Sequence, residues 1–337
     1  MKAMQISRII DLRSGQPPLD RVSLPVPDPG TNEIRIRVSA CGVCHTELDE
    51  IEGRTRPPRL PVVPGHEVVG VVDQCGANVN RFAPGDRVGV GWIYSSSGDD
   101  QENISDRFIA TGRDVNGGYA EYMSAHQDYA YAIPAVFSDS EAAPLLCAGG
   151  VGYRSLKLSG ISDGQSLGFT GFGGSAHIVL QLARYLYPSL KTYVFARDDR
   201  QRVHANELGA SWSGSTESRA PVQLDAIIDT TPAWTPVLHA LDNLRPGGRL
   251  VINAIRKEND DRGALQTLDY KRHLWQEKEI KTVANVTADD IRECLDIAAR
   301  IPLRPDLELY SFDNANQALI DLKSGKVRGA KVLIINE

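Results

Sequence analysis

The chain has 337 residues, of which 42% are hydrophobic, enough to build two domains with separate cores. Its formal net charge of -6 is spread along the sequence without a lysine- or arginine-rich run, which disfavours nucleic acid as a partner. No stretch approaches the roughly 20 apolar residues that span a bilayer, and the N-terminal residues lack the apolar core of a signal peptide. We therefore expect a soluble, cytoplasmic protein without a membrane partner.

The first part of the chain is predicted to be rich in β-strands. Ile34, Ile36 and Val38 alternate with polar residues between positions 32 and 40, which is the period-two pattern of a half-buried strand. Turn-forming segments occur at PDPG, APGD and NGG. Strands separated by such turns indicate a β-rich domain.

From about residue 166 the pattern changes. Short apolar segments, among them SLGFTG, TYVFA and AIIDTT, alternate with helix-like segments such as SAHIVLQLARYLY. This alternation predicts right-handed βαβ units and a parallel sheet. After residue 285 we expect a helix over 287–301, a strand, a helix near 314–324 and a last strand in VRGAKVLII.

The segment GFGGSAH lies between a predicted strand and a predicted helix. Gly171, Gly173 and Ala176 occupy the three small-residue positions of G-x-G-x-x-G/A, and Gly174 belongs to the same turn. The first glycine permits a tight turn, the second lets the backbone approach a pyrophosphate, and the third small residue lets the helix pack on the sheet. A lone glycine-rich loop could be an ordinary turn, but its position at the start of the βα units favours a dinucleotide site.

The end of the next predicted strand distinguishes the two nicotinamide cofactors. An NAD site usually carries Asp or Glu about 20 residues beyond the glycines, where it binds the ribose 2′-hydroxyl. This chain has Ala196 there, followed by Arg197, whose guanidinium could bind a 2′-phosphate. NADP(H) is therefore favoured over NAD(H). The alternative is that Arg197 pairs with Asp198, Asp199 or the neighbouring helix, and that either cofactor fits.

The cysteines point to metal chemistry rather than to disulfides. Five in a long chain is an odd number, which argues against a disulfide framework and for reduced thiols. Thiolates are therefore available to a metal. Three of the five cysteines are expected to pack as small apolar residues instead: Cys41, Cys75 and Cys294.

Three residues could hold a zinc ion. Cys41 and Cys44 form a C-x-x-C, which alone could be a redox pair or half of a structural zinc site, but the sequence has no second such pair. Cys44, His66 and Cys147 would supply three ligands and leave a fourth position open, as in catalytic zinc sites. That position suits an alcohol or carbonyl oxygen. Taken singly, Cys147 could be a buried apolar residue and His66 a hydrogen-bonded core imidazole.

The ordered motifs ACGVCHTEL, PGHEVVG, GDRVGVGW, NGGYAEY, GFGGSAH and LKSGKVRGAKVL extend over essentially the whole chain. With them, the chain resembles the zinc-dependent alcohol dehydrogenases of the medium-chain dehydrogenase/reductase superfamily. The resemblance implies an α/β fold, with a GroES-like β-rich catalytic domain in residues 1–149 and 286–337. It implies a Rossmann domain with a doubly wound parallel sheet in residues 150–285, and an active site in the cleft.

The resemblance also assigns roles near the metal. Cys44, His66 and Cys147 would hold the catalytic zinc, Glu67 matches a glutamate that approaches the metal in some family states, and Glu47 takes the place of a carboxylate that orients the histidine ligand.

Thr46 matches the hydroxyl that hydrogen-bonds the alcohol and passes on its proton. Asp49 stands where relatives commonly have a relay histidine, so either Asp49 or water would accept that proton. His45 and Arg328 match positions that face the cofactor pyrophosphate.

The loop after Trp92 departs from the family pattern. Relatives often carry four closely spaced cysteines there for a structural zinc, whereas this chain has Ser97 and Ser105 near those positions. Because serine is a poor zinc ligand beside thiolate, we expect one catalytic zinc per chain and no structural zinc. Trp92 itself could line the substrate pocket or simply pack in the core.

The resemblance implies a small-molecule primary alcohol or aldehyde as the substrate and a homo-oligomer, dimer or tetramer, as the assembly. Two alternatives to a zinc-dependent alcohol dehydrogenase remain open. One is a zinc-free enone or quinone reductase of the same superfamily, and the other is a noncatalytic NADPH-binding protein. The intact ligand positions disfavour both.

Overall fold

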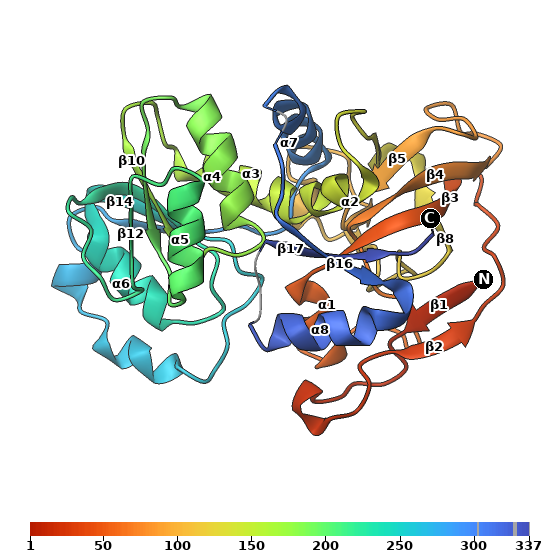
Figure 1. The fold of residues 1–337 in the computed structure, drawn as a ribbon, viewed down its shortest axis with the longest axis horizontal. Coiled ribbons are helices and arrows are strands. Elements are labelled where there is room, and N and C mark those ends of the chain that lie inside the picture. The colour runs from red at the N-terminus through yellow and green to blue at the C-terminus, as the bar shows by residue number, and fades with distance from the viewer. Residues whose placement is uncertain (302, 326–328, 337) are drawn as a thin grey trace. The chain divides into compact units, whose positions relative to one another are not determined.

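The computed structural model describes residues 1–301, 303–325 and 329–336. The described chain divides into two compact units. We call Met1–Gly150 with Val286–Glu337 the discontinuous unit, and Val151–Asn285 the central unit. In Figure 1 the discontinuous unit is drawn in red to yellow and in blue, because both parts of the chain contribute to it.

Within its described residues, the discontinuous unit is built on a seven-stranded, mostly antiparallel sheet. β17 (Ala330–Ile334) lies between β16 (Leu307–Ser311) and β3 (Glu33–Val43), so strands from both parts of the chain form one sheet. Beyond β3 follow β4 (Val68–Cys75), β5 (Arg87–Val90) and β9 (Ala130–Ala132), while β8 (Tyr122–His126) also pairs with β3.

The predicted strand at residues 32–40 is confirmed and extends to Val43 as β3. Ile34, Ile36 and Val38 are fully buried in the core, as the alternating pattern requires. The other strands and helices of this unit are β1 (Lys2–Gln5), β2 (Asp20–Ser23), β6 (Ile93–Ser95), β7 (Ile109–Ala110), α1 (His45–Ile51), α2 (Asp139–Ala142), α7 (Ala288–Arg300) and α8 (Ala315–Lys323). The last two match the helices expected after residue 285.

Every residue of the central unit is described, and six parallel strands form its sheet. Their order is β12 (Trp212–Gly214), β11 (Lys191–Phe195), β10 (Ser166–Thr170), β13 (Leu224–Asp229), β14 (Leu244–Ile252) and β15 (Glu279–Thr282). The chain moves outward from β10 to β12 and then returns to the other side of β10 with β13. This is the doubly wound order of dinucleotide-binding sheets, and the strand order reverses between β10 and β13.

Helices cover both faces of the parallel sheet. Ala226 and Ile228 of β13 pack with Val179 of α4 (Ala176–Leu186), whereas Ile227 between them packs with Leu241 of α6 (Thr235–Asn243). Alternate strand residues therefore face opposite helices, which confirms the predicted α/β class. The other helices are α3 (Ala148–Ser159) and α5 (Asp199–Glu207). None of the helices in the described part of the chain has the length and apolar character needed to cross a bilayer.

Candidate active site

Antiparallel pairing of β3 with β4 brings two of the predicted metal ligands to one end of the sheet. Because Cys41 of β3 pairs with Val68 of β4, the residues that follow β3 and precede β4 lie side by side. Cys44 follows β3 directly and is the N-cap of α1, and His66 lies just before β4. Cys147 comes from the segment between a short 3-10 turn and α3.

The ligand atoms converge to a distance that suits one metal ion. One ligand atom each from Cys44, His66, Glu67 and Cys147 lies within 4.8 Å of all the others. His66 Nε2 is 3.3 Å from Cys147 Sγ. Tetrahedral zinc with bonds of about 2.0 Å to nitrogen and 2.3 Å to sulfur separates such ligands by about 3.5 Å. These side chains therefore fit a zinc ion without rearrangement.

Glu47 connects two of these ligands. Its Oε1 lies 2.7 Å from His66 Nδ1, and its Oε2 accepts a hydrogen bond of 2.7 Å from the backbone N–H of Cys44. Both Glu47 and His66 are buried. With Nδ1 facing the carboxylate, Nε2 of His66 faces the cysteine sulfurs, which is how a carboxylate orients a metal-binding histidine.

The thiols near the site differ in acidity. The hydrogen bond with Cys147 lowers the pKa of Cys44 well below its usual value, and His66 lowers it further, although burial acts in the opposite direction. Burial raises the pKa of Cys41 well above its usual value. The Cys41 side chain packs in the hydrophobic core. Cys44 is thus the thiol that readily becomes a metal ligand, and Cys41 behaves as an apolar residue.

The Glu67 side chain packs against the backbone of β3 at Gly42, where there is no side chain in its way. A Cβ atom at Gly42 would be 1.8 Å from Glu67 Oε2, so no residue larger than glycine fits without displacing that carboxylate. Burial raises the pKa of Glu67 well above its usual range. Glu67 therefore adds an oxygen atom to the ligand cluster, at a position that depends on Gly42.

Thr46 and Asp49 both lie on α1 and are both buried. The Thr46 hydroxyl is 3.5 Å from Cys44 Sγ, next to the ligand cluster. Asp49 Oδ1 accepts hydrogen bonds of 2.9 and 2.7 Å from Nε and Nη2 of Arg54. Sequence reasoning missed Arg54, because nothing in the pattern showed that the arginine five residues later reaches back to this carboxylate.

Trp92 packs beside the metal ligands. Its ring lies 5.9 Å from that of His66 and 5.6 Å from that of Phe108, and the Arg113 guanidinium lies 5.7 Å from its centre. The side chain is largely buried. Trp92 therefore forms an aromatic wall next to His66 rather than packing in a distant part of the core.

Sequence reasoning also missed Glu50. This residue of α1 is fully buried, and among the described residues neither of its carboxylate oxygens has a hydrogen-bond partner. Burial, and then the charge of Glu47, raise its pKa well above the usual value. All of residues 46–51 are buried, polar and apolar alike. The helix α1 therefore has no alternation of polar and apolar faces from which the burial of Glu50 could have been predicted.

In the central unit, the glycine-rich segment forms the turn between β10 and α4. Gly171 has φ +78° and donates its N–H to Phe195 O at 2.8 Å, a left-handed turn that suits glycine. Nothing lies within 4 Å of a Cβ built at Gly173, so the backbone there is open to approach. Gly174 continues the turn, and Ala176 is buried as the first residue of α4. The turn has the form that the sequence predicted.

At the end of β11, Ala196 is buried and Arg197 is exposed. The neighbouring carboxylates are taken by other arginines: Asp198 pairs with Arg200, and Asp199 with Arg202. Among the described residues, an ion pair of Arg197 with either aspartate is therefore not found, and the choice between the two cofactors stays a prediction. Within the described chain, the Arg197 guanidinium makes no ion pair and stays available to a ligand.

Two further residues had been assigned to the cofactor pyrophosphate. His45 is the exposed first residue of α1. Arg328 lies outside the described residues.

The loop that carries serines in place of cysteines is closed by local hydrogen bonds. It runs from β6 through a short 3-10 turn at Glu102–Ile104 to β7. Ser96 Oγ donates to Glu102 O at 2.6 Å, and Ser105 Oγ accepts the Arg107 N–H at 3.2 Å. Ser97, which like Ser105 stands near a position where a cysteine was expected, lies in the same loop.

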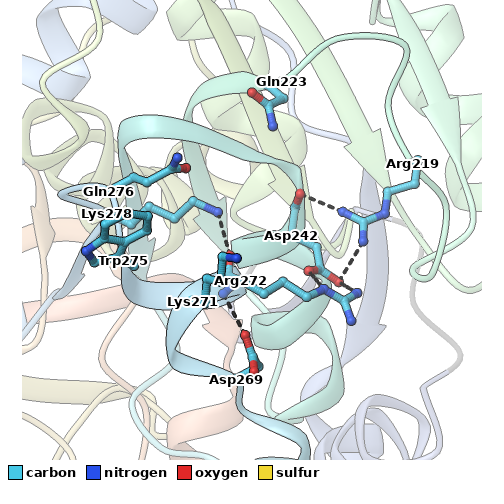
Figure 2. A pocket seen from close by; sticks show the side chains of 9 residues that line it. All are labelled: Arg219, Gln223, Asp242, Asp269, Lys271, Arg272, Trp275, Gln276 and Lys278. Atoms are coloured by element: carbon cyan, nitrogen blue, oxygen red, sulfur yellow. Dashed lines mark hydrogen bonds and ion pairs between the residues drawn. The ribbon is translucent and has the colours of Figure 1, made fainter.

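A surface pocket of about 400 Å³ in the central unit is lined by cationic side chains (Figure 2). Asp242 pairs there with both Arg219 and Arg272, as the dashed lines show. Lys278 Nζ donates to the backbone oxygens of Leu241 and Arg272. These charged side chains of the pocket are thus already bonded to other groups of the protein. These contacts hold the 270–278 segment to α6, so the pocket is not a strong candidate for a ligand site.

The family model of the alcohol dehydrogenase GroES-like domain matches residues 30–135. Among curated proteins, a probable alcohol dehydrogenase of Mycobacterium tuberculosis, AdhA, is 40% identical over 346 residues, covering 99% of this chain and 97% of that protein. An alcohol dehydrogenase of Geobacillus stearothermophilus is 32% identical over 320 residues, covering 90% and 92% of the two chains.

Solved structures resemble the chain over its whole length. A cinnamyl alcohol dehydrogenase of Sorghum bicolor superposes with a TM-score of 0.83 at 26% identity, covering 99% of this chain and 97% of that one. These relatives cover 90 to 99% of the chain, so the similarity includes both units.

Proposed function

The chain belongs to the alcohol dehydrogenases of the medium-chain dehydrogenase/reductase superfamily, and on that premise we propose that it is a zinc enzyme that uses NADP(H). Cys44, His66 and Cys147 would hold one catalytic zinc ion. The substrate would be a small primary alcohol or the corresponding aldehyde, and hydride would pass between its reacting carbon and the nicotinamide ring.

One observation carries the proposal of zinc. Two thiols and an imidazole lie within 4.8 Å of one another, together with a buried carboxylate. The imidazole is held in place by Glu47 at 2.7 Å. Three nitrogen and sulfur ligands with room for one more group are typical of catalytic zinc. A bound zinc would polarise the substrate oxygen and lower the pKa of an alcohol.

The other residues of the site would orient the substrate and move its proton. Thr46 is buried next to Cys44, so its hydroxyl would accept the alcohol proton and pass its own proton on. Asp49, on the same helix, is the proposed acceptor, with Arg54 holding its carboxylate in place. Trp92 would wall the site against water and favour an apolar tail on the substrate. In the oxidation, the alcohol loses one hydride to the cofactor and one proton to this path.

The choice of NADP(H) over NAD(H) rests on Arg197. Its exposed guanidinium comes directly after Ala196, which stands at the end of β11 where an NAD site would carry a carboxylate. Asp198 and Asp199 are neutralised by Arg200 and Arg202 and therefore repel a 2′-phosphate less. His45 remains a proposed pyrophosphate contact.

Self-association is also proposed, through the edge of the parallel sheet. All four residues of β15 are exposed, and the preceding segment exposes several large apolar side chains. They are Ile255, Leu268, Tyr270 and Trp275, and β15 itself adds Ile280. An exposed edge strand with apolar side chains favours pairing with a second copy. A dimer or a tetramer is expected, and light scattering of the purified protein measures which.

The five cysteines, all within the described chain, are free thiols, which supports a reducing compartment such as the cytoplasm.

The test combines metal analysis with activity. We expect one zinc per wild-type chain, and loss of both zinc and aldehyde reduction in Cys44→Ser and His66→Ala, while NADPH binding remains. Cys75→Ser, which changes a cysteine outside the cluster, is the control and should keep both. Full activity in a wild-type protein that contains no zinc would move the chain to the zinc-free reductases.

A further inference from the structure

A buried ion pair lies at the point where the strand order of the parallel sheet reverses. Asp229 is the last residue of β13, and its side chain is fully buried. Lys257, in the segment that follows β14, inserts its ammonium group against this carboxylate, and its side chain is only 7% exposed. Burying two charges is costly, and removing either partner would leave the other as an uncompensated buried charge.

The pair is part of a network that joins three neighbouring strands at their carboxyl ends. The Thr170 hydroxyl of β10 donates to Asp229 Oδ1, and the Thr231 hydroxyl donates to the same oxygen at 2.8 Å. Lys257 Nζ also donates to the backbone oxygens of Thr231 at 2.7 Å and Ala233 at 3.0 Å. Lys257, which lies in the segment after β14, thus holds residues 230–233, the segment after β13, in place.

The fixed segment lies directly against the glycine-rich turn. A Cβ built at Gly171 would be 2.9 Å from Thr230 Oγ1 and 2.9 Å from Thr231 Cγ2. Thr230 is itself held by β10, because its N–H and its hydroxyl both donate to Thr170 O at 3.0 Å. Any shift of residues 230–233 would therefore move the surface against which Gly171 and the glycine-rich turn pack. In open parallel sheets, ligands bind at the carboxyl ends of the strands, where the strand order reverses.

We propose that Lys257, acting through Asp229 and the carbonyls of Thr231 and Ala233, is a positioning residue that holds the glycine-rich turn in its dinucleotide-binding form. This inference rests on the proposed use of NADP(H). Among the described residues, the hydrogen bonds of Lys257 Nζ go to Asp229 and to the backbone oxygens of Thr231 and Ala233, not to the glycine-rich turn itself. It sets cofactor affinity by fixing the surface on which Gly171 lies, as the supporting residues of a preorganised site do.

The test compares NADPH affinity with thermal stability in the full-length protein. Lys257→Met leaves Asp229 buried without its partner, so this variant loses stability as well as affinity. The double variant Lys257→Met with Asp229→Asn removes the unpaired charge. We expect its melting temperature to recover while its dissociation constant for NADPH, measured by fluorescence titration, stays raised by about tenfold, because the hydrogen bonds to the two carbonyls are still missing. The zinc content should equal that of the wild type.

Lys271→Met is the matched control, because it removes an exposed lysine of the same unit (Figure 2) and should bind NADPH as the wild type does. A double variant that recovers both stability and wild-type affinity would overturn the inference and leave the ion pair a purely structural role. A wild-type protein that binds neither NADPH nor NADH would instead overturn the proposed cofactor.

If neither variant folds, hydrogen exchange of the wild-type protein decides the matter. Bound NADPH should then slow amide exchange in residues 230–233 and 254–258 together, because Lys257 links the two segments. Unchanged exchange in either segment on saturation with NADPH would overturn the proposal.

Discussion

The Glu102 carboxylate accepts the backbone N–H of Ala288 at 2.5 Å and thereby ties the loop after β6 to the first turn of α7. Its other oxygen accepts the Tyr129 hydroxyl at 2.9 Å. A carboxylate at a helix N-terminus satisfies a free N–H and interacts favourably with the helix dipole. This one side chain therefore fastens the loop in which relatives often use four cysteines and a second zinc.

Replacing Glu102 should destabilise the protein without changing its metal content. In Glu102→Ala, the Ala288 N–H and the Tyr129 hydroxyl lose a charged acceptor, at a cost of about 2 to 4 kcal/mol in the free energy of unfolding. Urea unfolding measures this loss, and metal analysis should still find one zinc per chain. Gln101→Ala, which changes the exposed neighbouring residue, should unfold as the wild type does. A lower zinc content in Glu102→Ala would contradict our view of this loop.

Glu47 should control zinc affinity through His66. In Glu47→Gln the charge that faces His66 Nδ1 is removed, and we expect zinc affinity to fall by about 10- to 100-fold. Competition with a chromogenic chelator measures this change. Glu50→Gln alters a second buried glutamate of α1 and serves as the control, because it should change zinc affinity little. Equal losses in both variants would show that the general negative charge matters, and not the contact with His66.

Arg197 should decide between the two cofactors. In Arg197→Ala, KM for NADPH should rise by about tenfold while KM for NADH changes little, because only NADPH has a 2′-phosphate. Arg200→Ala is the matched control: this exposed arginine is already paired with Asp198, so its removal should leave the preference unchanged. Steady-state kinetics with both cofactors measure the ratio, and an unchanged ratio in Arg197→Ala would rule out this role.

His273 should make the protein less stable in acid. Its Nδ1 accepts the Asp269 N–H at 2.8 Å, so Nε2 carries the proton and faces Asp242 at 3.2 Å. Burial lowers the pKa of His273, although Asp242 acts in the opposite direction. The unfolded chain therefore binds a proton below about pH 6.5 that the folded chain binds less readily, and stability is lost as the pH falls through that value.

Melting temperatures between pH 5 and 8 measure this contribution. The loss of stability below about pH 6.5 should be smaller in His273→Gln than in the wild type, because glutamine does not titrate. A steeper acid loss in His273→Gln would mean that the folded protein binds the proton more tightly than the unfolded chain does.

The sequence predicted the features that depend on local pattern. The alternation of Ile34, Ile36 and Val38 predicted β3, and the alternating strands and helices predicted the parallel sheet. The glycine spacing predicted the turn at Gly171, because the chemistry of such a turn lies within a few adjacent residues.

The sequence could not predict contacts that depend on tertiary packing. Glu102 reaches a residue 186 positions away, and Lys257 reaches Asp229 across 28 positions. Neither pair has a spacing that a helix or strand period would mark, and a charged residue in a polar loop is normally expected to be solvated. Arg54 illustrates the same limit at short range, since only the path of the chain after α1 turns its guanidinium toward Asp49.

The placement of β17 between β16 and β3 also constrains how the protein is made on the ribosome. Lys331 of β17 pairs with Val43, the residue before Cys44, yet β17 is synthesised only after the whole central unit. Until then β8 pairs with residues 33–37 of β3, whereas residues 40–43, next to the candidate metal site, have no strand in the position that β17 will take. The central unit is contiguous in sequence, whereas completing the discontinuous unit requires residues far apart in the chain to meet, a closure that generally slows folding.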